Sequence, residues 1–168
     1  MPSTGSALVT HDDLDVRVKP EWIDFNGHMN IACYVTAFDL ATDNLFLLVT
    51  PQIWQDGHFT DGFFIVEMHV TYERELFEGD PLRFDSQMLG IDDKRLHYLH
   101  RMYHAEKGYL AATNEIMFLS VDTETRKVAP MRDDIHNAFA ALMDQHAELP
   151  RPPQAGRVMS VKARKPGR

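Results

Sequence analysis

A carboxylate, a glycine and an imidazole lie within five residues near the start of the chain, at Asp24, Gly27 and His28. The apolar residues 31–49, which have the composition of a helix, follow directly. Backbone N–H groups at a helix start lack internal partners and can polarise a carbonyl oxygen. A carboxylate held beside them can attack that carbonyl or activate a water molecule. The spacing therefore favours acyl-transfer chemistry with Asp24 as the catalytic group.

Each residue of this segment also has a purely structural interpretation. Asp24 can be a turn residue, since aspartate favours turns and caps, but we favour catalysis because a helix N-terminus stabilises an anion there. Gly27 is expected to supply a positive φ or a close backbone approach. His28 either orients the substrate, serves as an acid, or bonds a nearby carbonyl group. Asn30 is well placed to be the helix N-cap.

The composition indicates one folded domain. The 168 residues are 44% hydrophobic, which suits a single domain with a full core. The single cysteine, Cys33, excludes an internal disulfide framework and fits a reducing compartment. We expect no bilayer-crossing segment, because no run approaches the ~20 apolar residues required. Residues 1–8 lack the features of a secretion signal. The expected location is therefore the cytoplasm, without membrane binding.

The acidic charge of the chain is unevenly distributed. The net charge is −8, but residues 151–168 hold six basic residues and no acid, which leaves 11 basic and 25 acidic residues, a net charge of −14, on residues 1–150. A body this acidic argues against nucleic acid as a partner, because polyphosphate binding needs a basic face. The basic tail contains several prolines and glycines, so we expect flexibility. The predicted organisation is a mobile segment 1–12, a domain 13–148 and a flexible basic tail 149–168.

Hydrophobic periodicity predicts one buried helix and a sheet of antiparallel strands. The helix covers residues 31–49 and is apolar on nearly all sides, which indicates burial. A short strand precedes it at 14–18, longer strands follow at 63–75, 82–89, 95–104 and 109–121, and a second helix covers 132–146. Short turns imply antiparallel neighbours. The predicted class is α+β, with an antiparallel meander sheet wrapped around one long helix and a C-terminal helix.

Three further carboxylates need an explanation. Glu67 shares a predicted strand face with His69, where structural pairing is the expected role, and it is our second-choice catalytic carboxylate. Asp39 and Asp43 lie four residues apart on the apolar helix and need backbone groups, an arginine or a cationic ligand as partners. Alternation in the strand 63–75 predicts a shared opposite face for five residues: Phe64, Val66, Met68, Val70 and Tyr72.

We expect no metal site and no bound cofactor. The nine histidines are scattered, and the three on the predicted strand 95–104 lack further ligands nearby. The chain also contains neither a phosphate-binding glycine loop nor a dinucleotide-binding fingerprint.

The pattern D-x-x-G-H-x-N-x-x-x-Y, from Asp24 to Tyr34, resembles the active-site pattern of hotdog-fold acyl-CoA thioesterases of the 4-hydroxybenzoyl-CoA thioesterase type. The resemblance covers about residues 14–130. It implies an acyl-CoA substrate, catalysis by Asp24, and polarisation of the thioester carbonyl by a backbone N–H near Ile31. It also implies a homodimer or homotetramer whose protomers join their sheets edge to edge and build each site at that contact. No cofactor is implied, because the CoA moiety is part of the substrate.

Residues 20–30 and 38–43 are similar to those of the thioesterases of carnitine breakdown, which release betaine from betainyl-CoA. This likeness implies a small, cationic acyl group. A quaternary ammonium favours aromatic faces with a carboxylate nearby, and five residues are candidates for such an acyl pocket: Trp22, Phe25, Tyr34, Asp39 and Asp43. Alternatively, these aromatic residues are ordinary core and the acids are solvated or capped.

Two other functions remain open from the sequence. A hotdog hydratase or dehydratase acting on an acyl thioester needs a histidine with an acid across the site, an arrangement that His28 and Asp24 imitate poorly. A non-catalytic module that binds acyl thioesters would leave Asp24 with its turn role alone.

Overall fold

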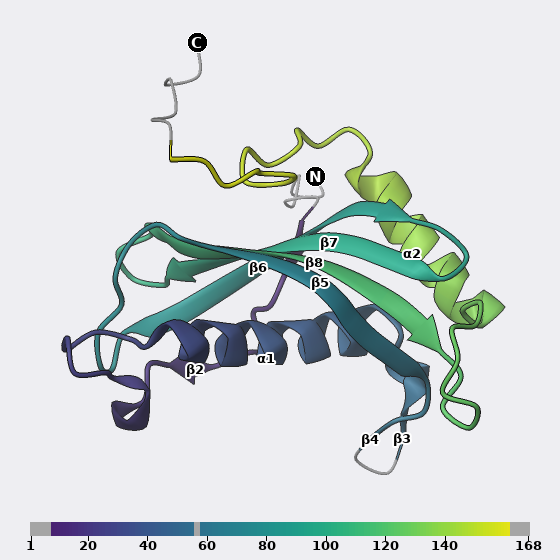
Figure 1. Ribbon diagram of the computed structural model, residues 1–168, viewed down its shortest axis with the longest axis horizontal. Coiled ribbons are helices and arrows are strands. Elements are labelled where there is room, and N and C mark those ends of the chain that lie inside the picture. Colours follow the sequence, from purple (N-terminus) through teal and green to yellow (C-terminus); the bar gives the residue numbers. More distant parts are fainter. Residues whose placement is uncertain (1–7, 56–57, 162–168) are drawn as a thin grey trace, which may run out of the picture.

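The computed structural model describes residues 8–55 and 58–161. Six strands form one antiparallel sheet that curves around a long helix, α1 (Figure 1). Along the sheet the order is β1-β6-β7-β8-β5, and β2 also pairs with β6. The elements are β1 (Val9–Thr10), β2 (Val16–Arg17), α1 (Ile31–Val49), β3 (Trp54–Gln55), β4 (His58–Phe59), β5 (Gly62–Tyr72), β6 (Pro81–Ile91), β7 (Arg95–His104), β8 (Leu110–Val121) and α2 (Asp133–His146). This is the predicted α+β hotdog arrangement.

The bounds of α1 agree with the sequence prediction because both ends carry local signals. The Asn30 side chain accepts a hydrogen bond from the N–H of Ala32, as an N-cap does. At the other end the helix stops before Pro51, which cannot continue it. Burial on all sides was a wrong prediction, since Ile31 is 63% exposed and Leu48 47% exposed. One side of α1 packs on the sheet and the other is open.

By length and composition alone, α1 is apolar enough to cross a membrane. The sequence prediction that no such run exists was therefore too strict. In the structure the inward side of this helix belongs to the core of the domain, as expected for the central helix of this architecture.

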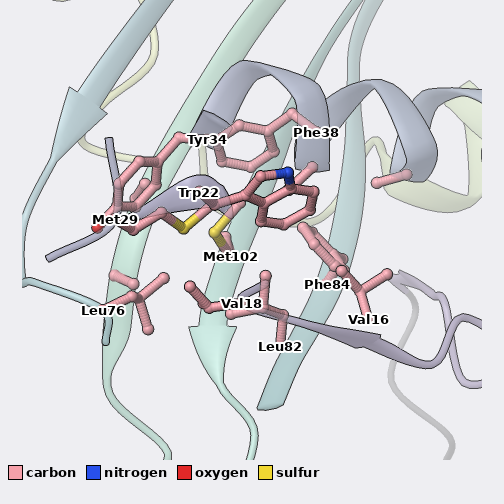
Figure 2. Close-up of a cluster of buried hydrophobic side chains, with 14 residues drawn as sticks. Val16, Val18, Trp22, Met29, Tyr34, Phe38, Leu76, Leu82, Phe84 and Met102 are labelled. Atoms are coloured by element: carbon pink, nitrogen blue, oxygen red, sulfur yellow. The ribbon is translucent and has the colours of Figure 1, made fainter. Parts of the chain in front are cut away.

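The core has two halves along α1. The first surrounds its N-terminal half, where Trp22, Tyr34 and Phe38 pack against β6 and β7 (Figure 2). The second surrounds its C-terminal half, where α2 adds its own apolar side and the rings of Phe46 and Phe139 lie 5.1 Å apart. Because α2 holds the far end of α1, the helix is fixed relative to the sheet at both ends.

Strand β5 contains a bulge that simple alternation misses. Its register with β8 shifts between Ile65 and Glu67, which leaves Val66 as the extra residue. The predicted shared face was therefore wrong at Phe64, which pairs with Leu119 and alternates with Phe63 and Ile65. The side chains that face α1 lie on both sides of the bulge: Phe63, Ile65, Met68, Val70 and Tyr72.

The outer edge of β5 is unpaired within the described residues, because β8 is its only neighbour there. Apolar side chains along this edge are partly exposed: Phe64, Ile65, Val66, Met68 and Tyr72. An exposed strand edge of this length is normally paired or covered, and a contiguous apolar surface marks an interaction site.

Both terminal segments differ from their prediction where the structure describes them. Within the segment expected to be mobile, Val9 and Thr10 form β1 and pair with β6. Residues 149–161, expected to be flexible, cross the sheet face opposite α1 (Figure 1). There the N–H of Gly156 donates to the Glu115 carboxylate over 2.7 Å, and Arg151 lies 3.9 Å from the same group. Anchoring by this half-buried acid explains the difference. Residues 1–7 and 162–168 lie outside the described parts.

Candidate active site

The loop before α1 is a tight hairpin that holds Asp24 and His28 together. The N–H of Asp24 donates to the carbonyl of His28, and the N–H of Gly27 donates to the carbonyl of Asp24, both over 3.0 Å. Gly27 has φ +81°, and a Cβ there would meet nothing within 4 Å. The glycine is therefore required for its backbone conformation and not for close packing, as one of the two sequence interpretations predicted.

The two oxygens of Asp24 have different surroundings. Oδ1 accepts a hydrogen bond from the N–H of Asn26 over 2.8 Å, which is the turn role considered from the sequence. Oδ2 has no hydrogen-bond partner among residues 8–55 and 58–161, and the side chain is half-buried. One oxygen thus fixes the carboxylate in the turn, and the other is available to a substrate.

The start of α1 offers one backbone donor. Asn30 occupies two of the first N–H groups, because its side chain accepts from Ala32 and its carbonyl accepts from Cys33. The N–H of Ile31 has no acceptor in the part of the chain that the structure describes. A free N–H at a helix start can bind a developing oxyanion.

A small cavity of about 170 Å³ adjoins this helix start. His28 and Tyr34 contribute to its wall, with Tyr72 from the end of β5. The His28 ring lies 3.3 Å from the carbonyl of Met29 and 3.9 Å from the carboxylate of Glu75. Burial raises the pKa of Tyr34 to about 12, so its phenol stays protonated near neutral pH. The cavity thus combines an imidazole with neutral hydroxyl groups.

Two residues of the predicted acyl pocket do not line a pocket in a single chain. Trp22 is 8% exposed and belongs to the core (Figure 2), where its carbonyl accepts the N–H of Asn30 over 2.8 Å. Phe25 is at the opposite extreme, with 97% of its surface exposed at the tip of the hairpin. The structure therefore gives Trp22 a structural contact and leaves Phe25 accessible to another molecule.

Asp39 and Asp43 line a second, larger cavity of about 520 Å³ between α1 and the first residues of β5, which we call the acidic cavity. Neither forms an ion pair with a lysine or arginine within the described ranges. Burial, followed by the nearby charge of Asp39, raises the pKa of Asp43. The complete lining is Asp39, Thr42, Asp43, Phe46, Asp61, Phe63, Phe64, Ile65 and Phe118.

The acidic cavity is distant from Asp24 within one chain. Ile31, at the helix start, precedes Asp43 by three helical turns, which corresponds to about 18 Å at a rise of ~1.5 Å per residue. The five residues predicted as one acyl pocket are therefore divided among the core, the hairpin tip, the small cavity and the acidic cavity. Sequence proximity to the motif did not reveal this division, because the helix carries its residues away from the hairpin.

Glu67 lies on the face of the sheet opposite α1. It pairs with Met117 of β8, whereas the next residue, Met68, pairs with the core residue Ile116. Glu67 lines a cavity there with Arg157 of the C-terminal segment. The sheet thus separates it from Asp24 of the same chain, which makes it a poor alternative carboxylate.

Sequence reasoning missed the other residues of the acidic cavity. Thr42 lies one turn after Asp39 and could have been found from helical spacing, whereas Phe63 and Phe118 come from distant strands. Asp61 is occupied by Arg132, whose guanidinium lies 3.1 Å from its carboxylate. Across residues 8–55 and 58–161, no group of three or more His, Cys, Asp or Glu side chains is arranged to hold a metal.

The sequence model of the family described as "Thioesterase-like superfamily" matches residues 18–139, which include the hairpin, α1 and the whole sheet beyond β1 and β2. The chain belongs to this superfamily. The thioesterase is 33% identical over 147 residues to a betainyl-CoA thioesterase of Pseudomonas aeruginosa, covering 88% of this chain and 92% of that protein. Its homologues support its assignment as a thioester hydrolase.

A second relative is a fused protein, the L-carnitine dehydrogenase/betainyl-CoA thioesterase of Rhizobium sp, with 31% identity over 151 residues. The match covers 89% of the thioesterase but only 30% of that longer protein.

Solved structures support the same fold. A putative thioesterase from Pseudomonas putida KT2440 superposes with a TM-score of 0.80 and 28% identity, over 95% of this chain and 100% of that one. A Staphylococcus aureus protein determined in complex with CoA gives a TM-score of 0.78 and 25% identity, over 92% and 96% of the two chains.

Proposed function

We propose that this thioesterase hydrolyses an acyl-CoA and that Asp24 is its catalytic carboxylate. The observation that carries the proposal is the position of Asp24 in the hairpin that leads into α1, where the Ile31 N–H is available as a donor. The carboxylate would act on the carbonyl carbon while the N–H stabilises the negative charge on the carbonyl oxygen. The relative solved with CoA supports this class of substrate.

One carboxylate is compatible with two routes. As a nucleophile, Asp24 adds to the carbonyl carbon, the C–S bond breaks, and CoA leaves as a thiolate that takes up a proton; water then hydrolyses the mixed anhydride. As a general base, Asp24 removes a proton from a water molecule whose oxygen attacks the same carbon. Both routes release the free acid and CoA, and neither needs a metal or cofactor.

Each site is expected to need a second copy of the chain. β5 is 11 residues long, and antiparallel pairing with its copy about the central residue, Glu67, would lay Tyr72 beside the second copy's Gly62. Tyr72 bonds the start of α1, and Gly62 leads into the acidic cavity. The helix start and Asp24 of one protomer would then face the acidic cavity of its partner. The exposed apolar edge of β5 supports this dimer.

The acidic cavity favours a small cationic acyl group. Asp39 and Asp43 supply negative charge without a basic partner in the described ranges, and Phe46, Phe63 and Phe118 supply aromatic surface. Quaternary ammonium groups are bound by this combination. The name of the Pseudomonas aeruginosa relative, a betainyl-CoA thioesterase, supports the same substrate. Hydrolysis of betainyl-CoA in the cytoplasm is the function we propose.

The experiment compares two acyl-CoAs of nearly identical shape. Betainyl-CoA carries a trimethylammonium group, and tert-butylacetyl-CoA replaces its nitrogen with carbon and so removes the charge. CoA release is followed with a thiol reagent, in buffer containing a metal chelator. We expect kcat/KM to be higher for betainyl-CoA by about 10²-fold, because two carboxylates face the charge. Equal values of kcat/KM would contradict a pocket for a cationic acyl group but would leave the thioesterase assignment intact.

The same assay separates the two rival functions. A hydratase or dehydratase would change the absorbance of an enoyl-CoA without releasing CoA, and a binding module would release none from any acyl-CoA. Our proposal requires that CoA is released in the presence of the chelator and that an enoyl-CoA is not hydrated.

A further inference from the structure

A chain of hydrogen bonds runs through the core from the acidic cavity to the N-terminal segment. Thr42, which lines the cavity, lies 3.1 Å from Nε2 of His100, and Nδ1 of His100 lies 2.5 Å from the Ser86 hydroxyl. Ser86 is also 2.6 Å from Nε2 of His11, whose Nδ1 lies 2.7 Å from the side-chain oxygen of Asn44. Thr42, Ser86, His100 and His11 are each at most 4% exposed. Thioester hydrolysis as derived above uses none of the three inner residues.

The partners give this chain one direction. Asn44 presents an oxygen, so Nδ1 of His11 donates to it and the bare Nε2 of His11 must accept from Ser86. Because Ser86 donates its single hydroxyl hydrogen to His11, its oxygen accepts a hydrogen bond from Nδ1 of His100. Burial lowers the pKa of both rings, which are therefore neutral near pH 7, with one donor nitrogen each. Nε2 of His100 is consequently an acceptor, and the Thr42 hydroxyl donates to it.

This direction determines what the acidic cavity offers to a ligand. Thr42 is the only residue of its lining whose side chain has a hydrogen-bond donor when the carboxylates are ionised. Its hydrogen points inward to His100, and its oxygen also accepts a hydrogen bond from Tyr98 over 3.4 Å. The side chains of the cavity wall therefore present oxygens and aromatic rings but no donor. A donor there would repel a cation and stabilise a neutral or anionic acyl group.

We propose that His100, Ser86 and His11 are positioning residues that keep the Thr42 hydrogen out of the acidic cavity and so set its preference for a cationic acyl group. The proposal rests on the proposed function, because it assigns this cavity to the acyl group. It does not depend on the identity of that group, since the direction of the chain is a property of the free protein.

The first test measures the tautomers of the wild-type protein. Two-bond nitrogen–proton correlation spectra at pH 7.5, with His11→Asn and His100→Asn spectra for assignment, distinguish a ring protonated at Nδ1 from one protonated at Nε2. We expect Nδ1–H for both His11 and His100. A proton on Nε2 of His100 would make this nitrogen the donor in the hydrogen bond with Thr42. This result would overturn the proposal, whatever the substrate.

The second test breaks the chain at Ser86. In Ser86→Ala, Nδ1 of His100 loses its acceptor, so the proton of the ring should move to Nε2. Nε2 of His100 would then donate a hydrogen bond to the Thr42 oxygen. The hydroxyl hydrogen of Thr42 would turn toward the cavity as a result. The ratio of kcat/KM for betainyl-CoA to that for tert-butylacetyl-CoA should fall roughly fivefold. A fall in that ratio is distinct from a loss of stability, which lowers both values together.

Removing the Thr42 hydroxyl supplies the control for this test. Thr42→Val preserves the shape of the side chain without a hydrogen to redirect, so Ser86→Ala/Thr42→Val should regain a ratio within about twofold of wild type. Recovery of the ratio in the double variant would exclude a merely structural role for Ser86. An unchanged ratio in folded Ser86→Ala, or no recovery in the folded double variant, would overturn the proposal. If the double variant does not fold, the ratio of Ser86→Ala and the wild-type tautomers decide the proposal. A wild type without any preference would instead count against the proposed acyl group.

Discussion

The hydroxyl of Tyr72 donates a hydrogen bond to the backbone carbonyl of Ile31, 3.1 Å away. Tyr72 is the last residue of β5 and Ile31 is the first of α1, so this bond joins the free edge of the sheet to the start of the helix. The ring of Tyr72 also packs edge-on against that of Tyr34, with centroids 5.1 Å apart. The candidate oxyanion donor thus adjoins the surface on which we expect a second copy to dock.

Replacement of Asp24 by asparagine should remove most of the activity without unfolding the protein. The amide oxygen of asparagine preserves the bond from the Asn26 N–H but is a far poorer nucleophile or base. We expect kcat to fall by about 10²-fold or more, with the melting temperature near that of wild type. The control is Asp13→Asn, at an exposed acid of the same N-terminal region. A nearly unchanged rate in Asp24→Asn would leave Asp24 with its turn role alone.

A charge placed on the free edge should separate the dimer. Val66 is the bulged residue of β5 and is 55% exposed, so a lysine there is tolerated in a monomer but not between two paired edges. Sedimentation velocity at micromolar concentration should show a dimer for wild type and a monomer for Val66→Lys, with loss of activity. Val128→Lys is the matched control, because Val128 is 51% exposed but lies outside β5. Two equally dimeric variants would refute this interface.

Removal of the N-cap should weaken α1 at the end that carries the site. Asn30→Ala takes away the acceptor of the Ala32 N–H, which costs about 1 kcal/mol of unfolding free energy. Asn30→Asp preserves a capping oxygen and should lose much less. Urea unfolding measures both variants. An equal loss of unfolding free energy in the two variants would show that the Asn30 side chain does not act as a helix cap.

Stability should fall on mild acidification because of the buried histidines. Burial lowers the pKa of His100 well below the ordinary value of 6.5 and also lowers that of His11. Below about pH 6.5 the unfolded chain gains protons that the folded chain does not bind, so the unfolding free energy drops as pH falls toward the folded pKa values.

The expected slope is about 1.4 kcal/mol per pH unit for each of these rings. Urea unfolding between about pH 8 and about pH 5 should show a smaller slope for His100→Gln than for wild type. The prediction fails if His100→Gln and wild type lose stability equally as the pH decreases.

The sequence predicted those parts of the fold whose signals are local. The bounds of α1 follow from an apolar run between Asn30 and Pro51, and β7 agrees with its predicted range because turns flank it on both sides. The bulge at Val66 was missed because period-two alternation cannot register one extra residue. The contact between Glu115 and Gly156 was missed because a backbone N–H leaves no trace in composition.

The candidate site was predictable only in part, for a related reason. The hairpin and the helix start are contiguous in sequence, so Asp24, Gly27, Asn30 and Ile31 were found together. The acidic cavity joins α1 to β5 and β8, and the buried chain beyond Thr42 uses residues from four segments. Contacts of this kind depend on strand register, which periodicity does not specify.

The measurement that tests the shared site most directly is complementation between two variants. Asp24→Asn protomers lack the catalytic carboxylate, and Asp39→Asn/Asp43→Asn protomers lack the charges of the acidic cavity, so each homodimer should hydrolyse betainyl-CoA poorly. When the two are unfolded together and refolded, half of the dimers are mixed, and each mixed dimer has one site with both parts intact. We predict recovery to about one quarter of the wild-type rate per protomer. A mixture that never exceeds the average of the two homodimers would contradict a site built from Asp24 of one protomer and the acidic cavity of its partner.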